Sequence, residues 1–169
     1  MSAWPDFRPA RVVERLTTRG VDFVVVGGFA AIAHGSTRIT RDLDICFATD
    51  RENLAALGEV LVELKASLRG APSDPPFVPD EETLRKVRVL TLDTLDGPLD
   101  VLVEPEGGPS YASLRRRAVR VDVAGVSALV ASLDDLLAMK QAAGRPKDIA
   151  DLEELEAIKR LRRRGRRRR

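Results

Sequence analysis

The order of a short apolar strand, a glycine pair, a small-residue helix and a second strand constrains the fold of this chain most strongly. Residues 22–26, Asp-Phe-Val-Val-Val, are mostly β-branched or aromatic, which is typical of a buried strand. Gly27-Gly28 interrupts that strand, and a short helix is expected over 29–34. Residues 42–48, Asp-Leu-Asp-Ile-Cys-Phe-Ala, predict a second strand. Two strands linked through a glycine bend and a short helix are therefore expected.

Apolar spacing and turn signals predict the remaining elements. Helices are expected over 9–19, from Asp50 to about Leu68, over 133–143 and over 147–161, and strands over 87–95 and 99–103, with a weaker hairpin over 118–130 and a loop over 70–80. Strands and helices are thus mixed, and hairpins join the middle strands. This pattern predicts an α+β or mixed α/β fold with a small, largely antiparallel sheet flanked by helices.

Length and charge predict one domain followed by a basic tail. The chain has 169 residues, of which 44% are hydrophobic, enough to form one core. Residues 159–169 hold nine basic residues and no acid, whereas residues 1–158 hold 19 basic and 26 acidic residues, a net charge of −7. We therefore expect a folded domain over 1–158 and a solvated, disordered tail over 159–169. Alternatively, the tail binds phosphate backbones without sequence preference.

Cysteine and hydropathy patterns predict a cytoplasmic protein. Cys46 is the only cysteine, which excludes a disulfide framework and suits a reducing compartment. The first twenty residues are rich in charge, so no signal peptide is expected, and no apolar run is long enough to cross a bilayer. His34 is the only histidine, so a zinc cluster is not expected.

Three aspartates are candidate metal ligands. Asp42 and Asp44 stand two apart on a predicted strand, so both carboxylates project from one face. Adjacent carboxylates repel one another unless a cation joins them, and Mg²⁺ or Mn²⁺ prefers oxygen ligands. Asp100 repeats the pattern on another strand and completes a two-metal site if the strands are neighbours. Alternatively, Asp-X-Asp pairs occur at ordinary strand edges, and Asp100 is a turn residue after Asp96-Gly97.

Residues 25–45, from Val25 through Gly27-Gly28 and Arg38-Ile39-Thr40-Arg41-Asp42-Leu43-Asp44 to Ile45, resemble the signature of nucleotidyltransferases of the DNA-polymerase-beta-like superfamily. The AbiEii-like branch, many of whose members are toxins of toxin–antitoxin pairs, is the most similar. The resemblance implies a nucleotidyltransferase fold, with nucleotide phosphates near Gly27 and Gly28. It assigns Arg38 and Thr40 to nucleotide binding or to fixing their loop. Where many members have serine after the glycines, this chain has Phe29, so the phosphate contact is expected from the backbone or from Ser36, Thr37 or Thr40.

A second stretch extends the resemblance to residues 22–152. Members of that branch carry a lysine on a late helix and then a basic Lys/Arg-Asp-X-X-Asp segment, which appear here as Lys140 and as Arg145-Pro146-Lys147-Asp148-Ile149-Ala150-Asp151. The resemblance places Lys140 among the catalytic residues, near the phosphates, with Arg145 and Lys147 assisting and the two aspartates ordering them. Alternatively, Lys140 is an exposed helix residue, and the aspartates only favour a helix start.

The combined expectation is a metal-dependent transfer of a nucleoside monophosphate from an NTP to an acceptor hydroxyl. The resemblance to toxins implies tRNA or another RNA as acceptor and a cognate antitoxin protein as partner, with no membrane. Two alternatives stay open. One is an inactive nucleotidyltransferase-like binding or antitoxin module. The other is a small-molecule nucleotidyltransferase of the aminoglycoside-modifying type.

Overall fold

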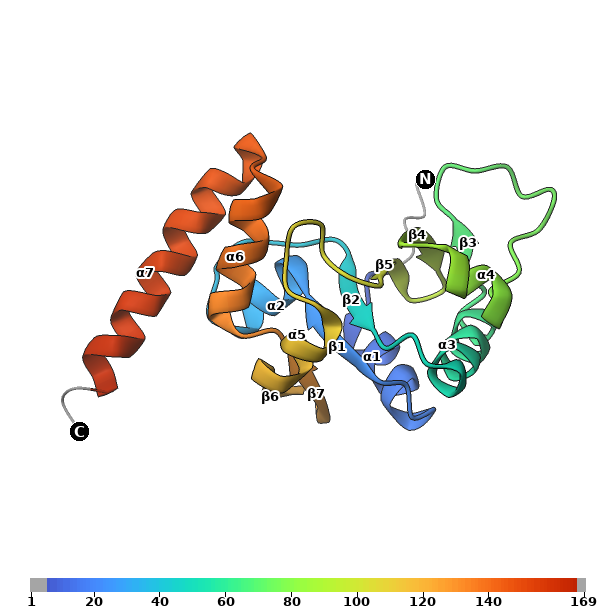
Figure 1. Ribbon diagram of the computed structural model, residues 1–169, viewed down its shortest axis with the longest axis horizontal. Helices are drawn as coiled ribbons and strands as arrows, with labels where there is room; N and C mark the ends of the chain where they lie inside the picture. The colour runs from blue at the N-terminus through green and yellow to red at the C-terminus, as the bar shows by residue number, and fades with distance from the viewer. Residues whose placement is uncertain (1–5, 167–169) are drawn as a thin grey trace.

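The computed structural model describes residues 6–166. Figure 1 shows the helices and strands of this part of the chain. The helices are α1 (Pro9–Thr18), α2 (Gly27–Ala33), α3 (Arg51–Glu63), α4 (Glu81–Lys86), α5 (Tyr111–Arg117), α6 (Leu133–Ala143) and α7 (Ile149–Arg166), with a 3-10 turn, η1 (Pro146–Asp148). The strands are β1 (Phe23–Val26), β2 (Leu43–Phe47), β3 (Ser67–Leu68), β4 (Val89–Thr94), β5 (Gly97–Leu102), β6 (Val119–Val123) and β7 (Val126–Val130).

All seven strands form one mixed sheet with the order β3-β4-β5-β2-β1-β7-β6. The pairs β1–β2, β3–β4, β4–β5 and β6–β7 are antiparallel, and β1–β7 and β2–β5 are parallel. The prediction of a small mixed, largely antiparallel sheet is confirmed. The central strands β1 and β2 connect through α2, so the glycine pair lies in the middle of the sheet's width.

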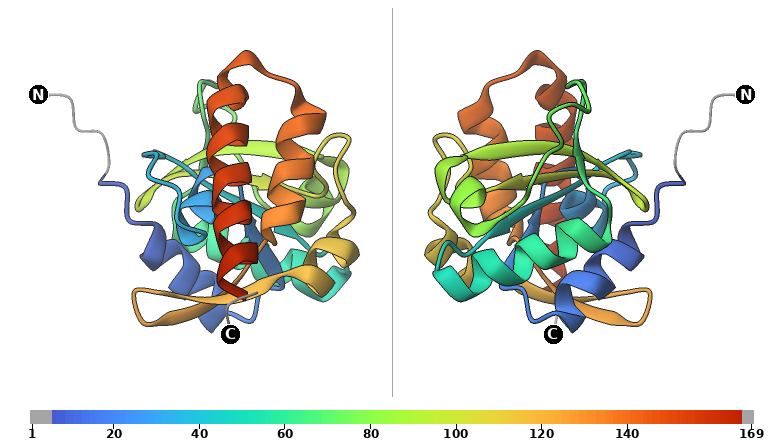
Figure 2. Two further views of the ribbon diagram at one scale, coloured as in Figure 1. Left: turned by 90° about the vertical axis from the view of Figure 1, so that its left-hand side faces the viewer. Right: turned by 90° about the vertical axis from the view of Figure 1, so that its right-hand side faces the viewer.

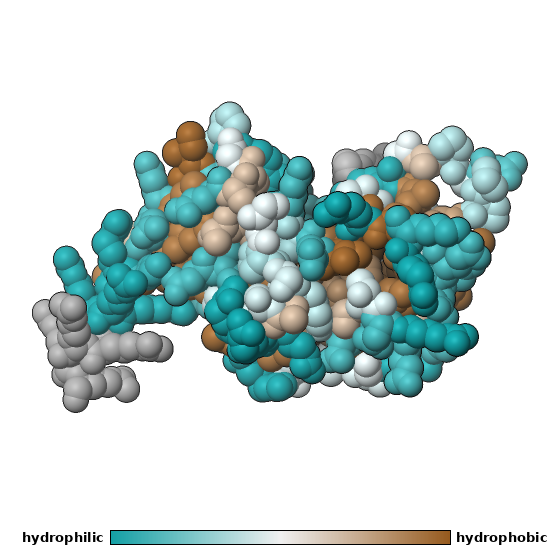
Figure 3. Space-filling view, viewed as in Figure 1, coloured by the Kyte–Doolittle hydropathy of each residue, from teal (hydrophilic) through white to brown (hydrophobic). Residues whose placement is uncertain are grey.

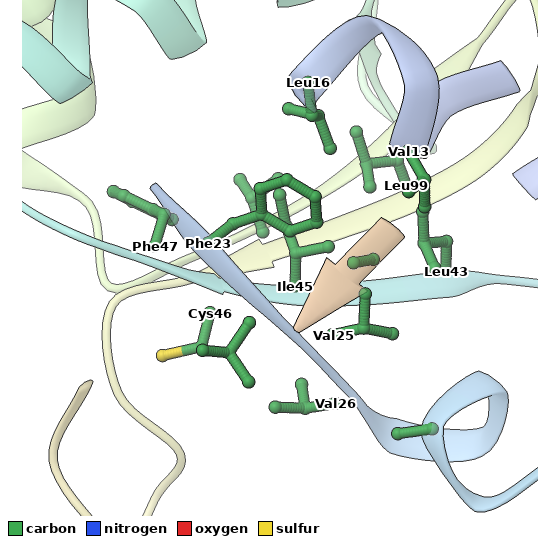
Figure 4. Close-up of a cluster of buried hydrophobic side chains, with 14 of the residues drawn as sticks. Val13, Leu16, Phe23, Val25, Val26, Leu43, Ile45, Cys46, Phe47 and Leu99 are labelled. Carbon is green, nitrogen blue, oxygen red and sulfur yellow. The ribbon is translucent and has the colours of Figure 1, made fainter. Parts of the chain in front are cut away.

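The core is mostly aliphatic, with Phe23 and Phe47 as its buried aromatic members. Side chains alternate across the strands, and Figure 4 shows Val13 and Leu16 of α1 on the same side of the sheet as Leu43, with Cys46 and Val26 on the opposite side. Val13, Leu16 and Leu43 are fully buried. Because odd positions of β2 enter this core, its even positions, including Asp44, belong to the other face of the sheet.

Helices α6 and α7 form an antiparallel hairpin at one end of the molecule (Figures 1 and 2). Ser132 caps α6 by accepting a hydrogen bond from the Asp135 amide, and Gly144 ends it in the left-handed conformation with φ +58°. The expected helix over 133–143 is confirmed. Proline at position 146 then begins η1, which leads directly into α7.

The structure differs from the expected tail, because α7 continues to Arg166 instead of giving way to a disordered segment at 159. Two contacts explain this continuation. Lys159 Nζ pairs with Asp134 Oδ1 at 2.7 Å, and Arg162 donates to Nδ1 of His34 at 3.0 Å and to the His34 carbonyl oxygen at 3.1 Å. The last residues of the expected tail, 167–169, lie outside the described part of the chain.

Several short elements differ from the expectation. Helix α2 begins at Gly27 itself, and α3 ends at Glu63, earlier than expected, before the two-residue strand β3. Helices α4 and α5 were not predicted, although each has a side-chain cap, since Asp80 and Ser110 accept hydrogen bonds from the amides of Thr83 and Ser113. They are shorter than two turns, so apolar periodicity does not reveal them.

Candidate active site

Asp44 lies at the middle of the sheet, directly beside Asp100. Strands β2 and β5 are parallel neighbours, and their register pairs Asp44 with Asp100, while β1 pairs Val26 with Asp44. Paired residues on adjacent strands project from the same face. The expected neighbourhood of the two strands is therefore present. Asp42 precedes β2, and its Oδ1 accepts a hydrogen bond from Thr40 Oγ1 at 2.8 Å.

The two glycines allow the backbone to approach these side chains closely. Gly27 has φ +66°, and a Cβ atom added there would lie 2.2 Å from Asp44 Oδ2. A Cβ atom added at Gly28 would lie 2.8 Å from Thr40 Oγ1. Such distances are far inside van der Waals contact, so any side chain at 27 would displace the Asp44 carboxylate. The glycine pair is thus part of the site as well as a bend.

A polar cavity of about 250 Å³ opens beside Gly27 and Gly28. Nine of the ten residues that the sequence assigned to the site line it, namely Gly27, Gly28, Arg38, Thr40, Asp42, Asp44, Lys140, Arg145 and Lys147. They come from α2, the 36–42 segment, β2, α6 and the turn before α7. Asp100 is the exception: it adjoins Asp44 in the sheet but does not line the cavity.

The cationic side of the cavity is an ion-pair network. Lys140 Nζ donates to Asp148 Oδ1 at 3.2 Å and to Asp151 Oδ2 at 2.6 Å. Arg145 Nε donates to Asp148 Oδ2 at 2.7 Å, and Arg38 Nη1 pairs with Asp151 Oδ1 at 2.5 Å. The Lys140 side chain is only 13% exposed. The two aspartates therefore hold three cations in fixed positions around the cavity, and Lys140 is not an exposed helix residue.

The acidic side of the cavity carries charge that no cation of the described residues offsets within ion-pair distance. Burial, and then the neighbouring charges of Asp42 and Asp100, raise the pKa of Asp44 from 3.8 to about 7. Burial also raises the pKa of Asp100, against the opposing effect of Arg69, whose Nη2 lies 3.2 Å from Asp100 Oδ1. Asp100 is thus held by a cation, whereas Asp42 and Asp44 are not.

The donor set fits a divalent cation in part. Asp42 and Asp44 present oxygen ligands, and their mutual repulsion is the electrostatic condition that a cation relieves. Within residues 6–166, however, no group of three or more histidine, cysteine or acidic side chains is arranged to hold a metal ion. The third expected ligand, Asp100, is instead paired with Arg69.

Sequence reasoning missed two side chains that hold the site together. Arg69 pairs with Asp100 from the β3 side, and it also donates to the Leu92 carbonyl oxygen at 2.8 Å. Glu154, on α7, accepts hydrogen bonds from Ser36 and Thr37, and these bonds lower the pKa of its carboxyl group. Both act across long sequence distances, and no local pattern in the sequence signals them.

The hydroxyl groups expected to contact phosphate are engaged elsewhere. Ser36 Oγ and Thr37 Oγ1 donate to Glu154 at 2.6 and 2.8 Å, and Thr40 Oγ1 donates to Asp42. Of the contacts left open by the sequence, the backbone amides at Gly28 and Phe29 are therefore the ones that remain, since no side chain caps α2.

Cys46 and His34 are structural residues. The Cys46 thiol is buried and donates to the Val103 carbonyl oxygen at 2.9 Å, and burial raises its pKa to about 12. Cys46 is therefore a small buried thiol that packs in the core. His34 Nε2 lies 2.7 Å from the Ala131 carbonyl oxygen while Arg162 donates to Nδ1, so the neutral ring donates from Nε2.

Solved structures of nucleotidyltransferases share this fold. The lincosamide antibiotic adenylyltransferase LnuA, lincomycin-bound, has a TM-score of 0.59 and 16% identity, covering 88% of this chain and 94% of that chain. ANT(2'')-Ia in complex with adenylyl-2''-tobramycin has a TM-score of 0.55 and 16% identity, covering 93% and 94%. An antigenic nucleotidyltransferase-like protein from Paracoccidioides brasiliensis has a TM-score of 0.55 and 16% identity, covering 90% and 73%.

No curated protein sequence matches the chain. Among residues 6–166, no helix combines the length and apolar character that a membrane span requires. A sequence family does match, over residues 10–163, and it is described as a nucleotidyltransferase of unknown function (DUF6036). That match spans most of the chain, and it includes the glycine pair, all three aspartates and the late lysine. The chain therefore belongs to the DUF6036 family of nucleotidyltransferases.

Proposed function

We propose that this nucleotidyltransferase moves a nucleoside monophosphate from an NTP to an acceptor hydroxyl in the polar cavity. The observation that carries the proposal is the meeting of uncompensated carboxylates and clustered cations in one space of about 250 Å³. A triphosphate needs cations and backbone amides on one side, and the reacting centre needs carboxylates on the other. Residues far apart in the sequence provide both.

Each side chain has a proposed role. Lys140, Arg145 and Lys147 bind the triphosphate, and Asp148 fixes the first two. Arg38 and Thr40, which line the same cavity, contact the nucleotide. The acceptor oxygen attacks the α-phosphorus, the bond from that phosphorus to the bridging oxygen breaks, and pyrophosphate leaves. Asp100, the neighbour of Asp44 in the sheet, would accept the acceptor's proton once it leaves Arg69.

The metal assignment belongs to the same proposal. Asp42 and Asp44 would hold Mg²⁺ or Mn²⁺, with Asp100 as a further ligand if it leaves Arg69. When bound, such an ion neutralises phosphate charge and makes the acceptor hydroxyl more acidic. The raised pKa of Asp44 supports this assignment, because it marks the carboxylate that gains most from a cation.

The acceptor that we propose is RNA, including tRNA. Arg160, Arg163 and Arg164 are exposed on α7, and none of them pairs with a carboxylate of the described residues. Figure 3 shows this end of α7 as a hydrophilic surface. Leu155 is the last residue of α7 that lines the cavity. Because a helix rises about 1.5 Å per residue, these arginines lie about 8 to 14 Å further along α7. That is a suitable distance for binding the phosphate backbone of an acceptor whose end reacts in the cavity.

A small-molecule acceptor is the second candidate. It is favoured by two of the structures that share this fold, one described as a lincosamide antibiotic adenylyltransferase and the other in complex with an adenylylated tobramycin. At 16% identity, these likenesses support a shared fold but not a shared substrate. We further propose that the chain acts in the cytoplasm, where its buried free thiol stays reduced.

The toxin role is a separate proposal and rests on the resemblance to AbiEii-like proteins. It predicts that expression arrests growth, that Asp44→Asn removes the arrest, and that a cognate antitoxin protein restores growth. Growth unaffected by an enzyme that is active in vitro would refute the toxin role alone.

One experiment tests the reaction and the acceptor together. The protein is incubated with each α-³²P-labelled NTP and Mg²⁺, with total RNA or with a panel of aminoglycosides and lincosamides. Label is expected on RNA, and Asp44→Asn should abolish it while Asp74→Asn, a change in an exposed loop, should not. Label on a small molecule would favour the second candidate. Absence of label with every NTP and acceptor would support an inactive binding module.

A further inference from the structure

One carboxylate on α7 ties down the segment that enters the site. The segment of residues 36–40 has no regular secondary structure, and it supplies Arg38 and Thr40 to the cavity. Glu154 accepts three hydrogen bonds from it, one at 2.6 Å from Ser36 Oγ and two at 2.8 Å from the amide and hydroxyl of Thr37. Both of its carboxylate oxygens are therefore occupied by the same short segment.

A second tether lies one helical turn away. Asp151 precedes Glu154 by three positions, so the two side chains share a side of α7. Asp151 pairs with Arg38 Nη1 at 2.5 Å and also accepts from Lys140. Arg38 thus has one contact to α7 through its own side chain, and its neighbours have three through Glu154. Without Glu154, the backbone just before Arg38 would keep only the bond from the Ser36 amide to the Ala31 carbonyl oxygen at 3.0 Å.

We propose that Glu154 is a positioning residue for the nucleotide, which acts by holding the 36–40 segment so that Arg38 and Thr40 face the cavity. This rests on the proposed nucleotidyl transfer. Glu154 itself touches neither carboxylate of the reacting centre. It does not line the cavity, whereas its neighbour Leu155 does. Without Glu154, the 36–40 segment must be ordered each time a nucleotide binds. This entropic cost weakens nucleotide binding more than it slows the chemical step.

The expected effect is a split between KM and kcat. Glu154→Ala should raise KM for the NTP about tenfold, the lower end of what loss of a supporting contact does, and leave kcat within about twofold. Glu154→Gln keeps one oxygen acceptor for Thr37 but none for Ser36. Its KM for the NTP should therefore lie between those of the wild type and Glu154→Ala. Glu153→Ala is the matched control, because Glu153 is an exposed glutamate on the same turn with no contact to the segment among the described residues.

A double-mutant cycle separates positioning from general stability. Thr37→Val alone should raise KM, and adding it to Glu154→Ala should have little further effect, because both changes remove the bond from the Thr37 hydroxyl to Glu154. A merely structural role would instead lower the melting temperature and kcat together, with additive effects. Circular dichroism on each variant establishes that it is folded before kinetics are compared.

Hydrogen exchange at the Thr37 amide tests the tether without any activity. That amide donates to Glu154, so Glu154→Ala should remove its protection while Glu153→Ala should not. Unchanged Thr37 exchange in Glu154→Ala refutes the tether. Lost protection with an unchanged dissociation constant for Mg²⁺ and α,β-methylene-ATP refutes the positioning role. A wild-type chain that binds this analogue without transferring label from any NTP refutes the proposed reaction and leaves the positioning result standing.

Discussion

Replacing Asp44 by asparagine is expected to stabilise the folded chain at neutral and alkaline pH while abolishing nucleotidyl transfer. The substitution preserves shape, so it respects the contact with Gly27, but it removes a charge that burial and two neighbouring carboxylates disfavour. The rise in pKa from 3.8 to about 7 corresponds to roughly 4 kcal/mol at 1.36 kcal/mol per unit. Because the new amide needs partners of its own, we expect a gain of about 1–3 kcal/mol at pH 8.

The direction of the pH dependence follows from proton binding. Since the folded pKa of Asp44 is raised, the folded state binds more protons than the unfolded state between about pH 4 and pH 7. The contribution of Asp44 is therefore fully favourable below pH 4, and it is lost as the pH rises through 7. Asp44→Asn removes this dependence, so the variant should exceed the wild type at pH 8 and approach it at pH 4.

Urea unfolding followed by circular dichroism, with EDTA present, measures this difference at pH 4, 6 and 8. Asp74→Asn serves as the charge-matched control. Mg²⁺ should then stabilise the wild type more than Asp44→Asn, because ligand binding to the folded state adds stability by mass action. If Asp44→Asn is less stable than the wild type at pH 8, or if the difference does not vary with pH, the electrostatic account of this site is wrong.

Gly27→Ala should lower the free energy of unfolding by about 2 kcal/mol or more, because φ is positive there and the new Cβ clashes with Asp44. Gly20→Ala, at φ +71° with open space around it, should lower it by about 1 kcal/mol. Thermal melts and transfer assays should show that only Gly27→Ala removes activity. Lys140→Met should raise KM for the NTP and lower the free energy of unfolding by about 3 kcal/mol, because it leaves two carboxylates without their shared cation; an unchanged KM would contradict its role. Cys46, whose pKa is raised to about 12 by burial, should react with a thiol reagent only after unfolding in urea, and labelling of the native protein would contradict its burial.

Much of the candidate site was predictable because its parts are local motifs. The glycine pair and Asp42-Leu43-Asp44 stand within one strand–helix–strand unit, whose spacing fixes which way each side chain projects. Lys140 and the Arg145–Asp151 segment were found through resemblance, and the cavity brings them to the same place. The central strands and the long helices followed from period and caps in the same way.

The rest depends on contacts between distant segments. The ion pair of Asp100 with Arg69 depends on how β3, β4 and β5 are paired, and nothing near position 100 in the sequence indicates it. Glu154 meets Ser36 across 118 positions. From its own sequence, the basic end of α7 is predicted to be a solvated charge run. It is helical in the structure because Arg162 contacts His34. Tertiary contacts overrode local composition at each of these places.

The hydrogen bonds between Glu154 and the 36–40 segment, which form a clasp between that segment and α7, imply that the site is completed late in synthesis. A growing chain exposes the aspartates of the sheet well before it has synthesised the helix that completes the cavity, since the two partners of that clasp lie 118 residues apart. Closing a contact of such long separation also costs more chain entropy than closing a local one. Nucleotide affinity should therefore develop only once α7 has been made and packed in place, and a fluorescent NTP analogue would report on that step.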